Sequence, residues 1–315
     1  MKRDPRPALL VVLGPTGSGK SDLAHEVARL RQGEIVSADA FAVYRGLDVG
    51  TAKPSPGRRA EVPYHLIDVA DPAETFSAGL WASRARGIIQ DIARRGRLPI
   101  VCGGSGFYIS ALLSGLPPGA ATDARLRQAL TRWARGRGEA AHRFLSLNDP
   151  ISAAGIPPGN LRYTLRALEI LLVTGRKASD RVRREDGWAR RFRLIQIGLA
   201  PSREDLYARI AARVRQMLQA GWNAEVRRLL DGGVSLESNA FRAVGYREVA
   251  DWVQRRARRD ETEKRIVTVS RQLAKRQKTW FARQRGVEWV APEAAMAVVL
   301  ARLDEDEGEK EAEER

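Results

Sequence analysis

Short apolar runs recur along the first third of the chain, and each is followed by a turn rich in glycine or small polar residues. The runs at 8–13, 34–37 and 98–102 are typical of buried strands. Segments at 22–31 and near 107–113 follow two of these runs and predict helices. This repetition of strand, loop and helix predicts a parallel sheet in an α/β fold.

The pattern becomes mostly helical between 121 and 193, after Pro117-Pro118-Gly119. Residues 194–199 are strand-like again, so we predict an α/β core formed by 8–120 and 194–303, with 121–193 as a helical insertion. Ser202 begins a long predicted helix in which Asp205 completes a capping-box pattern. A last basic helix is predicted at about 261–283, and 304–315 form an acidic tail that we expect to be disordered.

The net charge of +16 is unevenly distributed. The tail at 304–315 has a net charge of −6, whereas the insertion at 121–193 has +9. Such a surplus suggests a polyanionic partner, for example a nucleic acid. Only eight of the 54 basic residues are lysines, and an arginine excess also arises from genome composition. Charge alone therefore leaves nucleic-acid binding open.

The cysteine and histidine content excludes a domain stabilised by disulfide bonds and a domain stabilised by a Cys/His zinc site. One cysteine and three histidines cannot form a disulfide framework or a Cys/His zinc site. We expect Cys102, His25, His65 and His142 to be structural. No apolar run approaches the roughly 18 residues that a membrane span needs, and a lone thiol fits a reducing compartment. We therefore expect a cytoplasmic protein without a membrane partner.

A phosphate-binding loop is predicted at 14–21, where the sequence fits GxxxxGK[ST] between a strand and a helix. Glycines let backbone N–H groups converge on phosphate oxygens, and the helix adds its N-terminal dipole. The lysine would neutralise a phosphate, and the last hydroxyl would bind Mg²⁺. The predicted loop consists of Gly14, Pro15, Thr16, Gly17, Ser18, Gly19, Lys20 and Ser21.

The loop does not identify its ligand, because it accepts any di- or triphosphate. An ATPase also needs an Asp at the end of a hydrophobic strand to hold Mg²⁺, whereas the run at 98–102 ends in Cys102-Gly103-Gly104. Asp39, after the second run, is a candidate base beside the phosphates, and Asp68 is another candidate. An aspartate in a loop is more often a cap or turn residue.

Further segments follow the phosphate loop in a fixed order. They are Asp39 with VYRGLDVGTAKP at 43–54, GGSGFY at 103–108, RALE at 166–169, VGYRE at 244–248, RQLAKRQ at 271–277 and TW at 279–280. Each segment alone is a weak signal. The ordered set spans about 10–300 and closely resembles the bacterial tRNA dimethylallyltransferase family.

The resemblance implies a P-loop NTPase-like parallel sheet core with a mostly helical insertion that binds tRNA. It implies Mg²⁺-dependent transfer of a dimethylallyl group from dimethylallyl diphosphate to the exocyclic amino nitrogen of the adenosine 3′ of the anticodon, giving isopentenyladenosine and diphosphate. Asp39 matches the family's base, and Ser105 matches a Thr hydroxyl near the leaving group. Arg213 is the best match for the arginine that stabilises the diphosphate, with Arg209 one turn earlier as the reserve. In this scheme Ser21 holds the metal.

Residues 264–285 contain eight basic residues and no acidic one. Their helical spacing predicts a basic stripe, with Ile266, Val269, Leu273 and Trp280 mostly on a packing face. With the resemblance, this favours contact with the phosphates of the anticodon stem. The residues that we assign to tRNA are Asp39, Ala40, Phe41, Ala42, Ser105, Arg127, Arg162, Arg166, Phe241, Arg242, Gly245, Tyr246, Arg247, Arg271, Lys275, Arg276 and Lys278.

The sequence departs from the family pattern at two places. Ala40 and Ala42 stand where the family has Ser and Gln, so two polar side chains that could contact RNA or donor are absent. Tyr163 stands where Arg is common.

Two functions from other classes remain as alternatives. A small-molecule kinase with ATP in the loop gives no reason for the basic insertion. A basic RNA-binding module gives no reason for a complete phosphate loop with Asp39 and Ser105. A relative that prenylates free adenine nucleotides shares the chemistry, but the insertion favours tRNA. We expect a monomer.

Overall fold

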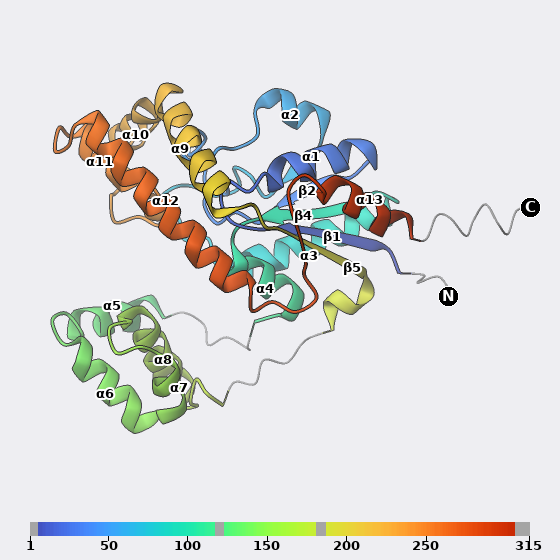
Figure 1. Cartoon of the computed structure of the whole chain (residues 1–315). Helices are drawn as coiled ribbons and strands as arrows, with labels where there is room; N and C mark the ends of the chain where they lie inside the picture. The colour runs from blue at the N-terminus through green and yellow to red at the C-terminus, as the bar shows by residue number, and fades with distance from the viewer. Residues whose placement is uncertain (1–5, 117–122, 181–186, 306–315) are drawn as a thin grey trace, which may run out of the picture. The chain divides into compact units, whose positions relative to one another are not determined.

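The computed structural model describes residues 6–116, 123–180 and 187–305 (Figure 1). The chain divides into two compact units, one formed by Met1–Leu113 with Gly187–Arg315 and the other by Ser114–Asp186. The sequence predicts the same order of segments, with the insertion at 121–193. The observed boundaries precede the predicted ones because the chain leaves the larger unit at the end of helix α4 (Gly106–Ser114) and returns to it at Gly187.

A six-stranded sheet forms the centre of the larger unit. Its strands are β1 (Ala8–Leu13), β2 (Glu34–Ser37), β3 (Tyr64–His65), β4 (Pro99–Gly103), β5 (Arg193–Leu199) and β6 (Glu288–Val290). They are arranged in the order β3-β2-β4-β1-β5-β6, and every neighbouring pair is parallel. The predicted α/β fold with a parallel sheet is confirmed. The sequence pattern missed β3 and β6, because strands of two and three residues leave no apolar run.

Buried aliphatic side chains attach two helices to one face of the sheet. Alternate residues of β1, Leu10 and Val12, pack with Val27 of α1 (Lys20–Leu30) and Val299 of α13 (Ala295–Asp304). Helices α2 (Pro56–Glu61) and α3 (Ala78–Arg94) lie between β2 and β4 in the chain. Trp81 of α3 donates from Nε1 to the carbonyl of Ser37, at 2.9 Å. This bond fixes α3 at the end of β2.

The C-terminal third adds a group of helices beyond β5: α9 (Arg203–Gln219), α10 (Trp222–Asp231), α11 (Tyr246–Val253) and α12 (Arg259–Phe281), with a short 3-10 turn at Ala240–Arg242. Another 3-10 turn, at Trp188–Arg191, precedes β5. Ser202 caps α9, because its hydroxyl accepts a hydrogen bond from the backbone N–H of Asp205 at 3.1 Å. Ala274 of α12 packs on Leu206 and Ile210 of α9, so the two helices lie side by side (Figure 1).

The smaller unit contains α5 (Ala124–Trp133), α6 (Gly138–Asn148), α7 (Pro150–Gly155) and α8 (Leu161–Thr174). Its core is small and consists of Leu145, Ala153, Ala167 and Leu168, with partly buried aliphatic neighbours. Within its described residues every regular element is a helix, as the sequence predicts.

The predicted tail needs one correction at its start. Asp304 is the last residue of α13 and forms an ion pair with Arg31, so the ordered helix continues into the segment expected to be disordered. The remainder, 306–315, lies outside the described residues.

Among the described residues, no helix is both long enough and apolar enough to span a bilayer.

Glu34 begins β2, at the end of the strand opposite to the phosphate loop. Its carboxylate is 3% exposed and interacts with Arg95, with Arg97 Nη1 at 3.1 Å and with His65 Nε2 at 2.7 Å. The hydrogen bond from Arg95 is the largest cause that lowers the pKa of Glu34 to about 2. This buried charge therefore stabilises the edge of the sheet.

Glu34→Gln imitates the protonated carboxyl and should lower the free energy of unfolding at neutral pH by on the order of 3 kcal/mol. The folded-state pKa lies below the ordinary value of 4.5, so the contribution is complete above that pH and disappears as pH falls toward 2. Urea titrations at several pH values should show the two proteins converging below pH 4.5, whereas Glu26→Gln, an exposed change, should stay near wild type. A difference that is independent of pH would contradict this account.

Candidate functional site

The phosphate loop lies between β1 and α1, as the sequence predicts. Gly14, Gly17 and Gly19 have φ angles of 148°, 83° and 92°, which residues with a Cβ rarely adopt. Gly19 is also the left-handed N-cap residue of α1. The loop therefore directs its backbone toward the N-terminus of that helix, where an anion is stabilised by N–H groups and the helix dipole.

Lys20 extends over the loop, and its Nζ donates to the carbonyl of Pro15 at 3.2 Å. Burial is the largest influence on this ammonium and lowers its pKa, while the charge of Asp39 acts in the opposite direction. A desolvated cation at the start of a helix attracts a phosphate strongly. The geometry therefore supports the role predicted for Lys20.

Two arginines of α9 reach the same loop. Arg213 Nη1 donates to Thr16 Oγ1 at 3.5 Å, and Arg209 Nη1 lies 3.7 Å from the point where a Cβ on Gly19 would stand. Burial lowers the pKa of Arg213, and Asp39 opposes this shift. Both the best match and the reserve choice from the sequence thus lie at the phosphate loop, and Arg213 is the more buried of the two.

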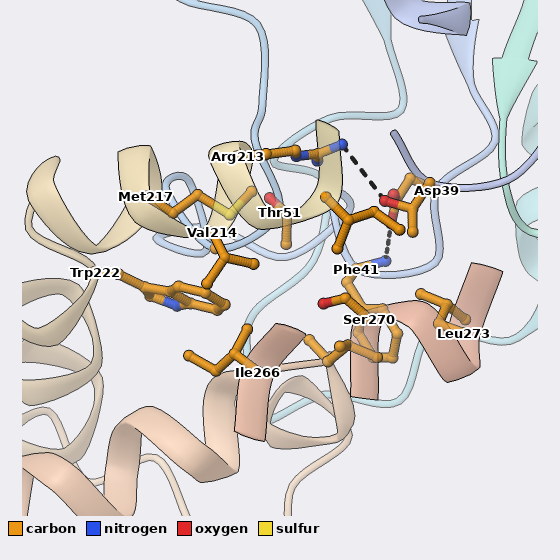
Figure 2. A pocket seen from close by; sticks show the side chains of 15 residues that line it. Asp39, Phe41, Thr51, Arg213, Val214, Met217, Trp222, Ile266, Ser270 and Leu273 are labelled. Atoms are coloured by element: carbon orange, nitrogen blue, oxygen red, sulfur yellow. Dashed lines mark hydrogen bonds between the residues drawn. The ribbon is translucent and has the colours of Figure 1, made fainter. Parts of the chain in front are cut away.

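Asp39 follows β2 and lies near Arg213 (Figure 2). Its Oδ1 accepts hydrogen bonds from the backbone N–H groups of Phe41, at 2.8 Å, and Ala42, at 3.3 Å. This is the turn geometry expected of an ordinary loop aspartate. The turn fixes the carboxylate at the pocket that Asp39 lines, and its role as a base remains a prediction.

Ser105 follows β4, and its Oγ accepts a hydrogen bond from the backbone N–H of Ala40 at 2.9 Å. Since β2 and β4 are adjacent parallel strands, their C-terminal ends bring Ser105 beside the turn of Asp39. The structure thus joins two residues that the sequence separates by 66 positions.

An apolar pocket opens beside Asp39 and Arg213 (Figure 2). Its polar end is formed by Thr16, Asp39 and Arg213. The remaining walls are mostly aliphatic or aromatic and come from α9, α10, α12 and two loops: Phe41, Gly50, Thr51, Ile210, Val214, Met217, Trp222, Ala243, Val244, Ile266, Ser270 and Leu273. Sequence reasoning did not identify these walls.

Trp222 forms the part of the pocket wall that is held most tightly. It is 1% exposed, and a Cβ on Gly50 or on Gly245 would lie only 2.2 Å from its indole ring. The indole therefore occupies the space between two glycines of separate loops. Gly245 also has a φ of 91°, so two constraints require glycine there.

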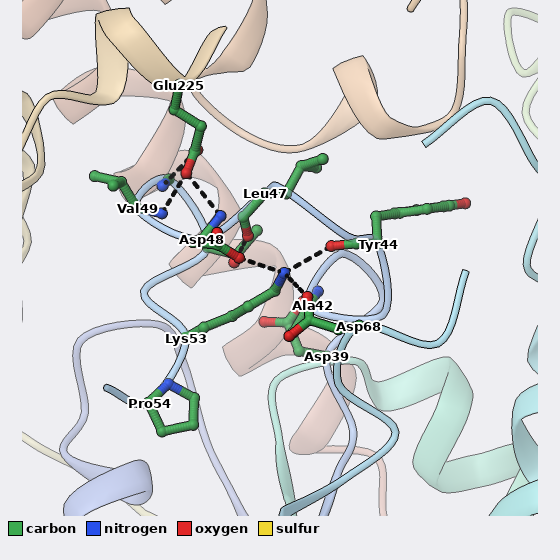
Figure 3. A network of polar contacts seen from close by, with 12 residues as sticks. Asp39, Ala42, Tyr44, Leu47, Asp48, Val49, Lys53, Pro54, Asp68 and Glu225 are labelled. Carbon is green, nitrogen blue, oxygen red and sulfur yellow. Dashed lines mark hydrogen bonds and ion pairs between the residues drawn. The ribbon is translucent and has the colours of Figure 1, made fainter. Parts of the chain in front are cut away.

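A buried carboxylate, Glu225, holds the loop that carries Gly50 (Figure 3). Its oxygens accept hydrogen bonds from the backbone N–H groups of Asp48 at 2.7 Å, Val49 at 2.6 Å and Gly50 at 3.2 Å. The hydroxyl of Tyr246 donates a fourth bond at 2.7 Å. This carboxylate fixes one wall of the pocket through the backbone, and no sequence pattern revealed it.

Lys53 and Asp68 belong to the same network of polar contacts. Lys53 Nζ donates to the carbonyl of Tyr44 at 2.6 Å and pairs with Asp48 at 2.8 Å and Asp68 at 2.5 Å. Arg59 also pairs with Asp68, at 2.7 Å. The sequence left Asp68 as a second candidate base, and the structure corrects this. Its carboxylate is occupied by two cations, whose hydrogen bonds lower its pKa against the effect of burial.

Several residues assigned to tRNA lie on the surface of the larger unit. Arg242, Arg247, Lys275, Arg276 and Lys278 are exposed. Arg271 is partly buried and lies over the ring of Tyr207, with 4.7 Å between its Cζ and the ring centroid.

The prediction of direct contact with RNA is wrong for four of the assigned residues, because the structure buries them. Phe241 and Tyr246 are 0% exposed and Ala42 is 5% exposed, and Gly245 is covered by Trp222. Similarity to a motif does not distinguish the buried members of a segment from the exposed ones. These four residues support the site through packing.

One aromatic side chain is more exposed than its pattern predicts. Trp280 was placed on the packing face of the basic helix, yet it is 42% exposed. It contacts Phe107, which is 52% exposed, edge to face with 6.5 Å between ring centroids. The packing prediction was correct for Ile266, which is 1% exposed.

In the smaller unit, two predicted RNA contacts are engaged within the protein. Arg127 and Arg166 pair with buried Glu169 at 2.7 and 2.8 Å. Arg162 and Tyr163 are exposed on α8. The assignments of Arg127, Arg162 and Arg166 to tRNA remain predictions.

A metal ion in this site would need oxygen atoms from a bound phosphate compound in addition to those of the protein. Within the described residues there is no group of three or more His, Cys, Asp and Glu side chains that could hold an ion. Ser21, on the exposed first turn of α1, offers one hydroxyl oxygen. This donor fits Mg²⁺ that arrives with a diphosphate, because Mg²⁺ usually takes few protein ligands and several phosphate oxygens.

Comparison with known proteins gives a consistent set of similarities. Residues 42–284 match the family model described as IPP transferase. A tRNA dimethylallyltransferase from Methylococcus capsulatus is 44% identical over 287 residues, which are 90% of this chain and 92% of the relative. A tRNA dimethylallyltransferase 1 from Pelobacter propionicus is 42% identical over 296 residues, covering 93% of this chain and 96% of the relative.

Solved structures agree with these sequence matches. The full-length tRNA isopentenylpyrophosphate transferase from Bacillus halodurans aligns with a TM-score of 0.70 and 33% identity, covering 98% of this chain and 100% of that protein. A eukaryotic dimethylallyltransferase acting on tRNA aligns with a TM-score of 0.77, covering 96% of this chain and 77% of that protein. At 23% identity, the second structure supports the fold alone.

Glu225→Gln should release the loop that carries Gly50, because an amide nitrogen then faces N–H or O–H donors. Leaving one buried donor without an acceptor costs about 1–3 kcal/mol. Hydrogen exchange should become faster at the amides of Asp48, Val49 and Gly50. The matched change is Glu139→Gln, whose carboxylate is 86% exposed. It should alter neither the free energy of unfolding nor the exchange rates of these three amides. Unchanged exchange at the three amides would contradict the role of Glu225.

Proposed function

The chain belongs to the IPP transferase family, and from this premise we propose that it transfers a dimethylallyl group from dimethylallyl diphosphate to tRNA. The acceptor in this proposal is the exocyclic amino nitrogen of the adenosine 3′ of the anticodon. One observation carries the proposal: an apolar pocket ends at a carboxylate and an arginine beside the phosphate loop. That arrangement suits a ligand with an apolar chain and a diphosphate.

The phosphate loop and its cations would bind the leaving group. Negative charge grows on the diphosphate as the allylic C–O bond breaks, and fixed donors and cations stabilise that charge. Lys20 and Arg213 are both desolvated beside the loop, so their attraction for an anion is little screened. Mg²⁺ bound through Ser21 would add a further positive charge.

The apolar pocket would hold the five-carbon group. Val214, Met217 and Leu273 line it, and apolar walls exclude water from an allylic centre that carries positive charge during the transfer. Exclusion of water protects such a centre from hydrolysis.

Asp39 would act on the acceptor. The exocyclic amine is a weak nucleophile because its lone pair is delocalised into the ring, and it loses a proton as the new bond forms. A positioned carboxylate promotes this step. Ser105 reaches the same turn through Ala40 and would place its hydroxyl near the leaving group.

The basic surface of α12 would bind the anticodon stem. Lys275, Arg276 and Lys278 are exposed on that helix, and most hydrogen bonds from such side chains to a nucleic acid go to phosphates. The target base would leave its stack to reach Asp39, as in other enzymes that modify a nucleobase. In the smaller unit, exposed Arg162 would add contacts.

The kinase alternative finds no support among the relatives, whose names are those of transferases acting on tRNA. Adding purified protein to labelled dimethylallyl diphosphate and unmodified tRNA tests the main proposal. Label should appear in the tRNA. Turnover with ATP and small acceptors alone would overturn the proposal.

Asp39→Asn should reduce the single-turnover rate by about 10²-fold or more, while the Kd for tRNA stays nearly unchanged. Asparagine keeps an oxygen for the N–H groups of Phe41 and Ala42, so the turn is preserved and only the base is lost. Rapid quench with excess enzyme measures the rate, and filter binding measures the Kd. Weak binding with normal chemistry would contradict the role of Asp39.

Binding of tRNA should weaken steeply with salt, because contact with phosphates releases counterions. A plot of log Kd against log salt should be linear, and Lys275→Gln should reduce its slope by about one contact. Arg94→Gln, which removes an exposed charge on α3 outside the segments assigned to tRNA, serves as the matched control. A flat salt response would refute the charge argument.

A further inference from the structure

The side chain of Gln277, on α12, connects two loops of the site. Its Oε1 accepts a hydrogen bond from the backbone N–H of Thr16 at 2.8 Å, and its Nε2 donates to the carbonyl of Gly104 at 3.0 Å. Thr16 belongs to the phosphate loop, and Gly104 precedes Ser105. One amide group therefore joins segments that lie 261 and 173 residues away in sequence.

The contacts of these two partners extend to each group assigned to catalysis. Thr16 also accepts, through Oγ1, the hydrogen bond from Arg213. Ser105, next to Gly104, accepts through Oγ the hydrogen bond from Ala40, the neighbour of Asp39. Gln277 thus lies between the residues of the leaving group and the residues of the acceptor.

The chemistry of the contact requires glutamine. One partner is a donor and the other an acceptor, so the side chain must present both an oxygen and an N–H group. Glutamate keeps the oxygen for Thr16 but sets a second oxygen against the carbonyl of Gly104. Methionine keeps the length and loses both bonds.

Gly104 shows how closely the amide is fitted. A Cβ on Gly104 would stand 2.3 Å from Nε2 of Gln277, whereas the nearest other atom, apart from Gln277 itself, would be 3.7 Å away. Gly104 is not among the described glycines with a φ in the left-handed region, so this source of strain does not oppose alanine there. Glycine is needed there because of Gln277.

We propose that Gln277 is a positioning residue that sets the distance between the phosphate loop, with Arg213, and the loop of Gly104 and Ser105, which is hydrogen-bonded to the turn of Asp39. The inference rests on the proposed prenyl transfer. In-line displacement depends on the placement of donor and acceptor, and a small misplacement far from the reacting atoms is costly. Gln277 itself touches neither substrate in this account.

Gln277→Met should lower the single-turnover rate constant by about 10- to 100-fold. The KM for dimethylallyl diphosphate and the Kd for tRNA should change by less than about threefold, because the binding groups remain. A loss of folded protein would lower the active fraction and not the rate constant. Gln219→Met, at the exposed end of α9, is the matched control and should behave as wild type.

A double-mutant cycle gives a second test with a separate route to the same defect. Gly104→Ala displaces the amide by collision, and Gln277→Ala removes it. Each change alone should reduce the rate constant, and the double variant should be no slower than Gln277→Ala. Additive losses, or a normal rate in Gln277→Met, would overturn the positioning role.

A readout without substrate separates this inference from the proposed function. Hydrogen exchange at the Thr16 amide should become faster in Gln277→Met and stay slow in Gln219→Met, whatever the protein transfers. Unchanged protection of Thr16 would overturn the inference. Wild-type protein that gives no labelled tRNA, yet loses this protection in the variant, would instead overturn the proposed function.

Discussion

The hydrogen bonds that hold β1 between β4 and β5 bring the C-terminal ends of three parallel strands to one edge of the sheet. The phosphate loop leaves from β1, the turn of Ser105 from β4, and α9 with Arg213 follows β5. Strand β2 pairs with β4 and adds Asp39 to the same edge. Ligands of α/β proteins bind at this edge for the same reason. Each chemical group of the site depends on this pairing.

The charged side chains at that edge of the sheet favour the binding of an anion. Lys20 and Arg213 are both desolvated, and burial lowers the pKa of each. Asp39 opposes both shifts, yet its Oδ1 is turned toward two backbone N–H groups. One carboxylate beside two partly buried cations leaves a positive surplus. A bound diphosphate would relieve the surplus, so the folded protein already contains part of the attraction for its donor.

The parts of the fold with regular patterns were predictable, and the parts made by distant contacts were not. The apolar runs gave β1, β2, β4 and β5, and the ordered motifs gave the family. The pocket walls were missed, because Val214, Trp222 and Ile266 come from three separate helices, and the pattern of one helix does not show which residues of other helices it meets. Gln277 ends the motif RQLAKRQ at 271–277, but the motif does not show that its amide group joins Thr16 to Gly104. Burial of Tyr246 followed from packing on Trp222, which a motif does not report.

The indole of Trp222, seated between Gly50 and Gly245, couples two distant positions that can vary, 50 and 222. A side chain at Gly50 would require a smaller residue at 222, and a smaller residue at 222 would leave a hole in the pocket wall unless position 50 gained a side chain to fill it. Changes at 50 and 222 should therefore be tolerated together rather than singly, whereas the φ of 91° requires glycine at 245 whatever stands at 222. A designer who wishes to reshape the pocket would have to treat 50 and 222 as a single choice.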